Sequence, residues 1–194
     1  MQEPDWDERY RERSVGDSDP VAVLEDNRHL LPAGGMALDL ACGLGANAVL
    51  LAEQGLKTFA WDRSAVAVEK LAAWSRENLL PITAEVRDVA AWPPEPARFD
   101  VVVVGHFLER QLARALRDAL NPGGLLFYQT FTRTRVSDRG PRTERFRLAD
   151  NELLHLFADL QVLVYREEGR VGDTARGFRD EAQLVARKPP VQED

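Results

Sequence analysis

The chain has 194 residues, of which 44% are hydrophobic and 29% are charged. This length suits one domain, and the composition is that of a folded globular protein. A single cysteine excludes a disulfide framework and a cysteine-rich zinc module. The net charge of −7 argues against a nucleic-acid-binding surface, and no apolar run reaches the roughly 20 residues that span a bilayer. The charged N-terminal stretch lacks the apolar segment of a secretory signal. We therefore expect a soluble, cytoplasmic protein that binds neither nucleic acid nor membrane.

Apolar, strand-like runs alternate with helix-like stretches along the chain. The strand-like runs are residues 36–40, 57–61, 82–86, 99–104, 125–130, 162–165 and 182–186. The helical patterns cover residues 46–54, a stretch that begins after the N-cap Ser64, residues 108–120 and residues 148–157, and residues 121–124 read as a turn. This alternation predicts βαβ units. The expected fold class is α/β: a Rossmann-like three-layer α/β/α sandwich around a mostly parallel seven-stranded sheet that ends in a C-terminal antiparallel hairpin.

A glycine-rich turn follows the first predicted strand. Gly43 and Gly45 would let the backbone approach a ligand near the N-terminus of a helix. With Ala48 they also fit the dinucleotide pattern G-x-G-x-x-A, but a pyrophosphate would sit badly beside the carboxylate of Asp39. No lysine follows a tyrosine by four positions, so the pair found in short-chain dehydrogenases is absent. A nicotinamide oxidoreductase therefore stays only as a minor alternative.

This turn and the acids that follow it resemble the motifs of the class I methyltransferases that use S-adenosylmethionine (SAM). The run Asp39-Leu40-Ala41-Cys42-Gly43-Leu44-Gly45 is similar to their first motif, with Ala41 where many members have glycine. Asp62 ends the second predicted strand, where the family's acid accepts hydrogen bonds from both ribose hydroxyls. Asp88 follows the third strand, where the family's acid meets the adenine amino group. The resemblance implies SAM as the cofactor, bound at the carboxyl edge of the sheet.

The resemblance extends to a set of cofactor-binding residues along that edge. They are Tyr10, Arg13, Asp39, Ala41, Cys42, Gly43, Gly45, Asp62, Arg63, Asp88, Val89, His106 and Phe107. It also implies that an N-terminal helix with Trp6, Tyr10 and Arg13 at helical spacing folds over the cofactor. An amphipathic helix packed on the sheet edge is the alternative. No metal site is expected.

His106 and Arg110 are the candidate catalytic residues. His106 follows the strand 99–104 at the edge where the methyl donor is expected, and Arg110 lies one helical turn further on. A helix-start or core histidine is the alternative for the first, and a solvent-facing side chain for the second. Because methyl transfer is an in-line displacement, positioning and the exclusion of water can supply most of the catalysis.

An arginine-rich segment, residues 131–147, follows the fifth predicted strand. It holds six arginines against two acids, and guanidinium groups bind oxyanions and carboxylates in a bidentate manner. We expect this segment to cover the carboxyl edge and to hold an anionic substrate through Arg133, Arg135, Arg142 and Arg147. A solvated loop with surface arginines is the alternative.

Three short motifs give a finer resemblance, to the tellurite-resistance methyltransferase group: residues 6–10, the glycine turn and residues 140–142. The predicted function is that of an enzyme, a SAM-dependent methyltransferase for a small anionic or soft-nucleophile acceptor such as tellurite or selenite. The alternatives are an O-, N- or S-methyltransferase for a carboxylated metabolite and a SAM-binding regulatory protein without turnover. One methyltransferase domain is expected over residues 1–188, with a helical cap at 1–30 and a tail at 189–194. The expected partner is a small-molecule substrate, and the oligomeric state stays open.

Overall fold

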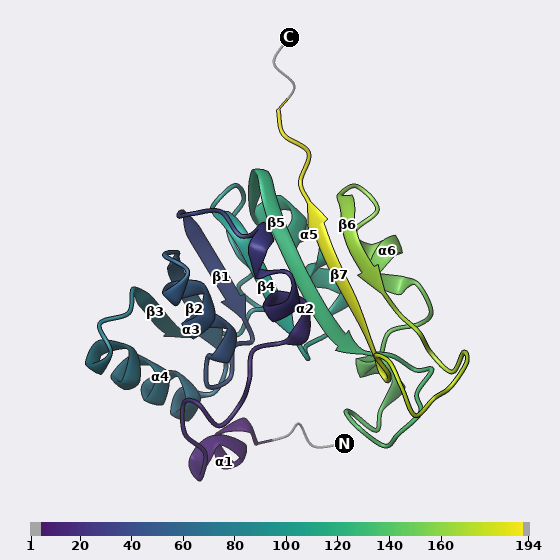
Figure 1. Cartoon of the computed structure of the whole chain (residues 1–194). Coiled ribbons are helices and arrows are strands. Elements are labelled where there is room, and N and C mark those ends of the chain that lie inside the picture. Colours follow the sequence, from purple (N-terminus) through teal and green to yellow (C-terminus); the bar gives the residue numbers. More distant parts are fainter. Residues whose placement is uncertain (1–4, 192–194) are drawn as a thin grey trace.

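The structure is a computed structural model and describes residues 5–191. Within them, seven strands form one sheet in the order β3-β2-β1-β4-β5-β7-β6 (Figure 1). The strands are β1 (Met36–Leu40), β2 (Lys57–Asp62), β3 (Ile82–Val86), β4 (Phe99–Gly105), β5 (Leu120–Phe131), β6 (Gln161–Arg166) and β7 (Glu181–Arg187). Strands β1 to β5 pair in parallel, and β7 runs antiparallel to β5 and β6. The predicted mixed sheet with its C-terminal hairpin is confirmed. Of the expected cap and tail, residues 1–4 and 192–194 lie outside the described part.

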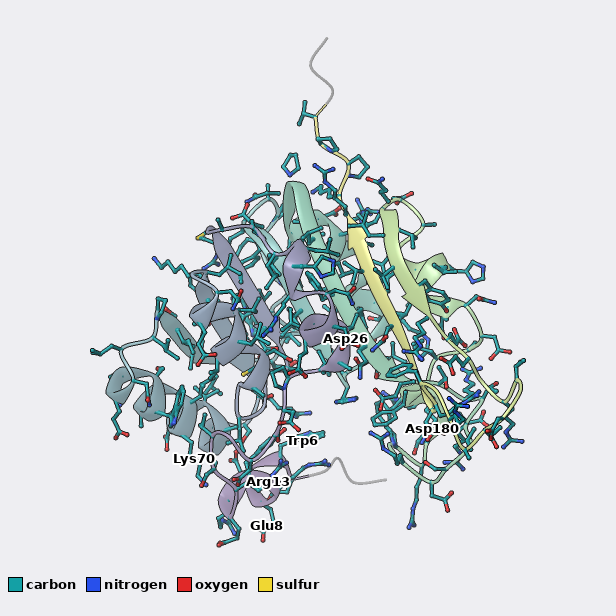
Figure 2. The ribbon with its side chains drawn as sticks, in the orientation of Figure 1. Trp6, Glu8, Arg13, Asp26, Lys70 and Asp180 are labelled. Carbon is teal, nitrogen blue, oxygen red and sulfur yellow. The ribbon has the colours of Figure 1, made fainter. Side chains whose placement is uncertain are left out.

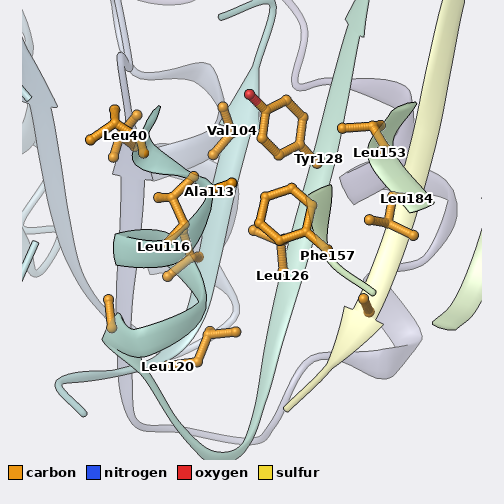
Figure 3. Packing of buried hydrophobic residues seen from close by; sticks show 14 of the residues in the cluster. Leu40, Val104, Ala113, Leu116, Leu120, Leu126, Tyr128, Leu153, Phe157 and Leu184 are labelled. Atoms are coloured by element: carbon orange, nitrogen blue, oxygen red, sulfur yellow. The ribbon is translucent and has the colours of Figure 1, made fainter. Parts of the chain in front are cut away.

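Helices cover both faces of this sheet. Between residues 5 and 191 they are α1 (Trp6–Arg11), α2 (Ala22–Asp26), α3 (Ala46–Glu53), α4 (Ala65–Glu77), α5 (Ala113–Ala119) and α6 (Glu152–Leu156), with 3-10 turns at Arg28–Leu30, Arg110–Leu112 and Glu144–Phe146. Side chains alternate between the faces along each central strand. Those on one face pack with α5 and α6 around Leu40, Val104, Leu116, Tyr128 and Phe157 (Figure 3). Those on the other pack with α2 and α3 around Val23, Leu24, Leu51, Val103 and Phe127.

Two predicted elements differ from the observed ones on the α6 side of the sheet. The predicted helix at residues 148–157 shrinks to α6, because Leu148 instead forms a bridge with Thr132. The backbone N–H of Leu148 donates to the carbonyl of Phe131, and the carbonyl of Leu148 accepts the N–H of Arg133. The predicted helix at 108–120 begins only at Arg110, as a 3-10 turn that leads into α5. Both changes leave room for irregular chain at the carboxyl edge of β4 and β5.

The predicted turn at residues 121–124 is part of β5 instead. Asn121 donates its side-chain amide to Asp100 Oδ1 at 2.8 Å, and the N–H of Gly123 donates to the carbonyl of Lys188. The pairing of β4 with β5 shifts register at this point. A Cβ on Gly124 would lie 2.9 Å from the carbonyl oxygen of Asn121, so only glycine fits this close backbone approach.

None of the helices in the described part of the chain combines the length and the apolar character needed to cross a membrane.

Candidate cofactor and acceptor site

The carboxyl ends of β1 and β4 lie side by side at the centre of the sheet. From β1 the strand order runs outward through β2 to β3, and from β4 it runs the other way to β5. Such a reversal opens a crevice at the carboxyl ends of the two central strands, where open α/β sheets bind ligands. The chain leaves β1 through Ala41 and Cys42, and it leaves β4 through His106. The sheet therefore brings the predicted glycine turn and the predicted catalytic histidine to one edge.

The glycine turn needs both of its glycines because other side chains fill the space around it. Gly43 and Gly45 have φ angles of 53° and 79°, in the left-handed region. A Cβ on Gly43 would lie 2.7 Å from the hydroxyl oxygen of Tyr10, and one on Gly45 would lie 2.4 Å from Cδ2 of Leu71. Ala41 adopts φ 57° in the same turn, so the position where the family often has glycine is a left-handed one here as well.

Asp39 is fully buried within β1 and faces the start of α3. Its Oδ1 accepts a hydrogen bond from Nδ2 of Asn47 and its Oδ2 accepts one from the N–H of Ala48, both at 3.1 Å. Burial raises the pKa of Asp39 to about 7, although the two hydrogen bonds oppose that rise. The side chain thus fastens the first turn of α3 to the sheet, beneath the glycine turn.

Asp62, the last residue of β2, closes the glycine turn from the neighbouring strand. Its Oδ2 accepts the N–H of Gly43 at 2.8 Å and its Oδ1 accepts the N–H of Ser64 at 2.9 Å. The residue is 7% exposed, and burial raises its pKa. The backbone N–H of Arg63 also donates toward this carboxylate, which offers about four lone-pair sites in all. Asp62 can therefore still accept a hydrogen bond from a ligand hydroxyl group, such as one on the ribose of SAM, so the residues present fit this cofactor. Arg63, the next residue, is exposed.

The acid expected after the third strand lies at the same edge. Asp88 is exposed, and its Oδ1 accepts the N–H groups of Ala90 at 3.0 Å and Ala91 at 3.3 Å. Val89 beside it is buried in the core. A hollow of about 390 Å³ adjoins the end of β3, lined by Glu85, Val86, Arg87, Asp88 and Trp92. Asp88 thus lines an open hollow that it shares with the aromatic side chain of Trp92.

Helix α1 is fastened to α4 at both of its ends. Near its start, Asp7 accepts hydrogen bonds from the hydroxyl of Ser64 at 2.6 Å and from the N–H of Val66 at 3.3 Å. At its C-terminal end, Nζ of Lys70 donates to the carbonyls of Tyr10, Arg11 and Arg13 at 2.9, 2.6 and 2.5 Å. Figure 2 labels Lys70 and Arg13 in the region of α1.

This attachment holds Tyr10 over the glycine turn. The Tyr10 ring stacks on Trp6 at a centroid distance of 6.3 Å, and burial, with the nearby charge of Asp62, raises its pKa to about 12. Arg13 lies beyond the end of the helix and donates to the hydroxyl of Ser18 at 2.6 Å. Cys42, in the turn itself, is half-buried, and burial raises the pKa of its thiol well above the ordinary value. The structure therefore brings Tyr10 to the predicted site and gives Arg13 a local partner.

His106 stands at the open side of the crevice. Its side chain is 43% exposed, and its Nε2 lies 2.9 Å from Oε2 of Glu181, whose side chain is 2% exposed. The ring stacks on Phe131 at a centroid distance of 5.0 Å, and the backbone of His106 has φ 53°. Phe107 uses its carbonyl to accept the hydroxyl of Tyr128. Glu181 thus holds Nε2 of the histidine and Phe131 packs against one face of its ring, while the side chain stays partly exposed.

Arg110 has a different role from the one predicted. Its Nε and Nη2 donate to the two carboxylate oxygens of Glu152 at 2.6 and 2.9 Å. Nη1 donates to the carbonyl of Arg145 at 2.6 Å, and Nη2 also reaches the carbonyl of Arg147 at 2.9 Å. The guanidinium group is therefore committed to holding the arginine-rich segment against α6. These four hydrogen bonds give Arg110 a structural role in place of the predicted catalytic one.

Arg147 is likewise a structural residue and not an open anion site. It is 1% exposed, and its guanidinium donates to the carbonyl of Pro141 at 2.6 Å, to that of Thr132 at 2.8 Å and to that of Arg139. Burial lowers its pKa. The segment closes around this side chain, so an anionic substrate cannot reach the guanidinium in this arrangement.

The other three predicted substrate residues remain accessible. Arg133 and Arg142 are exposed, and Arg135 is half-buried. The segment that carries them is also pinned at the start of β7, because Asp180 accepts from the N–H and the hydroxyl of Ser137 at 3.0 and 2.6 Å. Three arginines are therefore presented on an anchored loop beside the crevice.

Sequence reasoning missed several residues that complete the site. They are Asp7 and Lys70, which dock α1, and Gln129, Arg139 and Glu181, which surround His106. A signal for the second group existed: Gln129 and Gln183 are polar residues within largely apolar strands, and Glu181 is the first residue of the second of these strands. Within residues 5–191 no three His, Cys, Asp or Glu side chains are arranged to hold a metal ion.

Residues 37–124 match a family model described as "Methyltransferase domain". Over 135 residues the chain is 30% identical to the ubiquinone biosynthesis O-methyltransferase of Xanthomonas axonopodis pv. citri (strain 306), a match that covers 66% of this chain and 56% of that protein. Over 106 residues it is 33% identical to the trans-aconitate 2-methyltransferase of Variovorax paradoxus (strain S110), with coverage of 51% and 39%. The chain spans about half the length of these curated relatives.

Solved structures share the fold at lower identity. TehB from Haemophilus influenzae superposes with a TM-score of 0.72, 21% identity and coverage of 94% of this chain and 67% of that one. An S-adenosylmethionine-dependent methyltransferase from Mesorhizobium loti gives 0.66, 20% identity and coverage of 87% and 99%. The chain therefore shares the Rossmann-like fold of these structures, and its residues 37–124 are similar to the methyltransferase domain family. The family description and the two curated relatives all name methyltransferases, and the Mesorhizobium loti protein is named as dependent on S-adenosylmethionine.

Proposed function

We propose that this chain transfers the methyl group of SAM to a small anionic acceptor bound beside His106, under the arginine-rich segment. The observation that carries the cofactor half of this proposal is the position of Asp62. It joins β2 to the glycine turn, and its carboxylate keeps acceptor capacity for a ribose hydroxyl. SAM supplies an activated methyl group on a sulfonium, so the work left to this chain is to bind, to orient and to exclude water.

The proposed binding residues follow the sheet edge. Asp62 takes the ribose, and Asp88 with the hollow at the end of β3 takes the adenine. The glycine turn and Tyr10 enclose the remainder, with Asp39 acting from below through α3. We propose one domain over residues 1–188, in which α1 serves as the cap and residues 131–147 as the acceptor loop.

Two acceptor classes fit a site flanked by arginines. A carboxylated metabolite is favoured by the curated relatives, whose names specify an O-methyltransferase and a trans-aconitate methyltransferase. A soft oxyanion such as tellurite or selenite is supported by the motif resemblance and by the shared fold of TehB. For either class we propose that Arg133, Arg135 and Arg142 contact the negative charge, because their guanidinium groups are not buried as that of Arg147 is.

Calorimetric titration of SAM into the wild type, Asp62→Ala and the exposed control Asp26→Ala tests the cofactor site. We expect binding by the wild type and the control, and at least a tenfold loss in Asp62→Ala, about 1.4 kcal/mol. Thermal melts of all three proteins show whether the variant is folded. The absence of binding by the wild type would overturn the proposed function, and unchanged affinity in a folded Asp62→Ala would overturn the role of this carboxylate.

A further inference from the structure

A buried carboxylate faces the candidate catalytic histidine, and the proposed function does not use it. Glu181 is the first residue of β7 and its side chain is 2% exposed. Its Oε2 lies 2.9 Å from Nε2 of His106 and accepts Nε2 of Gln129 at 2.7 Å. Its Oε1 accepts from Arg139 at 3.2 Å. A buried carboxylate is tolerated only when hydrogen-bond donors surround it. For Glu181, one of these donors is the ring of His106.

The contact determines which nitrogen of His106 carries hydrogen. An ionised carboxylate only accepts hydrogen bonds, so the hydrogen must lie on Nε2. In the neutral ring Nδ1 is then bare and able to accept a proton. Nδ1 has no hydrogen-bond partner among residues 5–191, and the His106 side chain is 43% exposed.

The surroundings of His106 hold this orientation. Phe131 stacks against one face of the ring, and the backbone N–H donates to the carbonyl of Gln129 at 2.8 Å. The left-handed backbone of a non-glycine residue costs free energy and is found where neighbouring structure enforces it, often at functional sites. Gln129 is fixed in turn, since its Oε1 accepts the N–H of Val23 at 2.8 Å and Nε2 of Gln183 at 3.1 Å. The histidine is thus preorganised from β5, β7 and α2.

We infer that His106 acts as a general base through Nδ1, that Glu181 is the positioning residue that fixes its tautomer, and that the acceptor is a small anionic molecule methylated at a hydroxyl group. This inference rests on the proposed function. The hydroxyl oxygen forms a bond to the methyl carbon, and the carbon–sulfur bond breaks with its electron pair going to the sulfonium sulfur. The hydroxyl proton goes to Nδ1 of His106 and leaves later to solvent.

A general base at His106 would distinguish acceptor classes that the arginines alone cannot distinguish. A carboxylate or a selenite ion attacks as an anion and has no proton to lose, so a preorganised base adds nothing to its methylation. An alcohol or phenol does lose a proton, and a positioned base typically contributes about 10²- to 10⁴-fold to the rate. Arg139 belongs to the arginine-rich segment and contacts Glu181, so the same segment lies within reach of the anionic group of such an acceptor.

Nitrogen-15 NMR of the histidine rings tests the tautomer without any turnover. The chain has three histidines, and substitution of each by Gln assigns the signals. At a pH where the ring is neutral, we expect a protonated Nε2 and a bare Nδ1 for His106 in the wild type and in the exposed-glutamate control Glu53→Gln. In Glu181→Gln, whose amide can also donate, we expect a mixture of tautomers. A mixture already in the wild type, or no change in Glu181→Gln, overturns the positioning role.

Steady-state kinetics test the acceptor class, with 3,4-dihydroxybenzoate as an anionic phenol and with trans-aconitate and selenite as acceptors without a hydroxyl proton to remove. We expect His106→Gln to lower kcat for 3,4-dihydroxybenzoate by about 10²-fold or more. Glu181→Gln should lower kcat about tenfold with little change in KM, and the control His29→Gln should leave both unchanged. Transfer to trans-aconitate or selenite alone, or full kcat in both variants, overturns the inference. Because SAM binding is measured separately by calorimetry, these outcomes are distinct from failure of the proposed function.

Discussion

The carboxylate of Asp62 accepts the N–H of Gly43 at 2.8 Å, so that the end of β2 holds the turn that leaves β1. The hydroxyl of Tyr10 lies above the same glycine, close enough that a Cβ there would approach it to 2.7 Å. Three segments far apart in sequence therefore meet at one residue without a side chain. The geometry of the cofactor site depends on this meeting point as well as on the acids that the motif supplies.

A side chain at Gly43 is expected to disturb both contacts. Gly43→Ala places a Cβ against Tyr10 and strains a left-handed backbone, which should cost roughly 1–3 kcal/mol of unfolding free energy. Tyr10→Phe removes the atom that is approached most closely. In a double-mutant cycle followed by urea denaturation, the combined variant should therefore be more stable than the sum of the single changes predicts.

Gly34→Ala is the matched control for that cycle, since a Cβ there would meet no atom within 4 Å. It should change stability little in either background. Simple additivity of Gly43→Ala and Tyr10→Phe would show that Tyr10 does not pack over the turn in solution.

Lys70 is expected to keep α1 in place over the site. Its ammonium group donates to three carbonyls at the end of α1, and Lys70→Met leaves those acceptors without it. We expect faster chymotrypsin cleavage at Trp6 and Tyr10 and a severalfold weaker affinity for SAM. Lys57→Met, at an exposed position of β2, is the control. Equal cleavage rates in the two variants would argue that the contact between Asp7 and Ser64 holds the helix without Lys70.

Most of the fold could be predicted from the sequence, because the strands are short local patterns. The buried run Val101–Val104 and the glycines after β1 specify a parallel sheet and its first turn with little outside help. The acids at 39, 62 and 88 are also local signals. Their burial was not predictable, since it depends on which elements pack above them: Asp39 is enclosed by α3, whereas Asp88 stays exposed.

The arginines show why the rest could not be predicted. Arg110 and Arg147 look like the other arginines in the sequence, yet their partners are Glu152 and a set of backbone carbonyls whose positions depend on a loop without regular structure. Every residue has a backbone carbonyl, so the sequence does not indicate which carbonyls accept hydrogen bonds from these arginines. Glu181 posed the same difficulty, because its contact with His106 joins residues 75 positions apart.

The burial of Asp39 predicts a pH dependence of stability. Its pKa rises to about 7 in the folded protein, from an ordinary value of 3.8. Between these values the folded chain holds a proton that the unfolded chain has released, so this group's contribution is full below pH 4 and is lost as pH rises toward 7. The difference in unfolding free energy between the wild type and Asp39→Asn should thus fall with pH, by up to about 1.4 kcal/mol per unit. Urea denaturation at half-unit steps from pH 4.5 to 8 measures it, and a flat difference would show that Asp39 is ionised throughout.

Arg147 and Arg142 should separate the stability of the acceptor loop from its binding of substrate. Arg147→Met removes a buried guanidinium and leaves the carbonyls of Thr132, Pro141 and Arg139 without its hydrogen bonds, which should cost about 1–3 kcal/mol of stability. Arg142→Met changes an exposed side chain, so stability should stay within about 0.5 kcal/mol.

For transfer to an anionic acceptor, Arg142→Met should raise the acceptor KM severalfold while the affinity for SAM stays unchanged. Urea denaturation and acceptor titrations on both variants give the comparison. If Arg147→Met were as stable as the wild type, or if Arg142→Met kept the wild-type KM, the division between an anchoring and a binding arginine would be wrong. The structure supports that division because the Arg147 guanidinium is buried among backbone carbonyls, where a substrate cannot reach its N–H groups, whereas Arg142 is exposed on the same anchored loop.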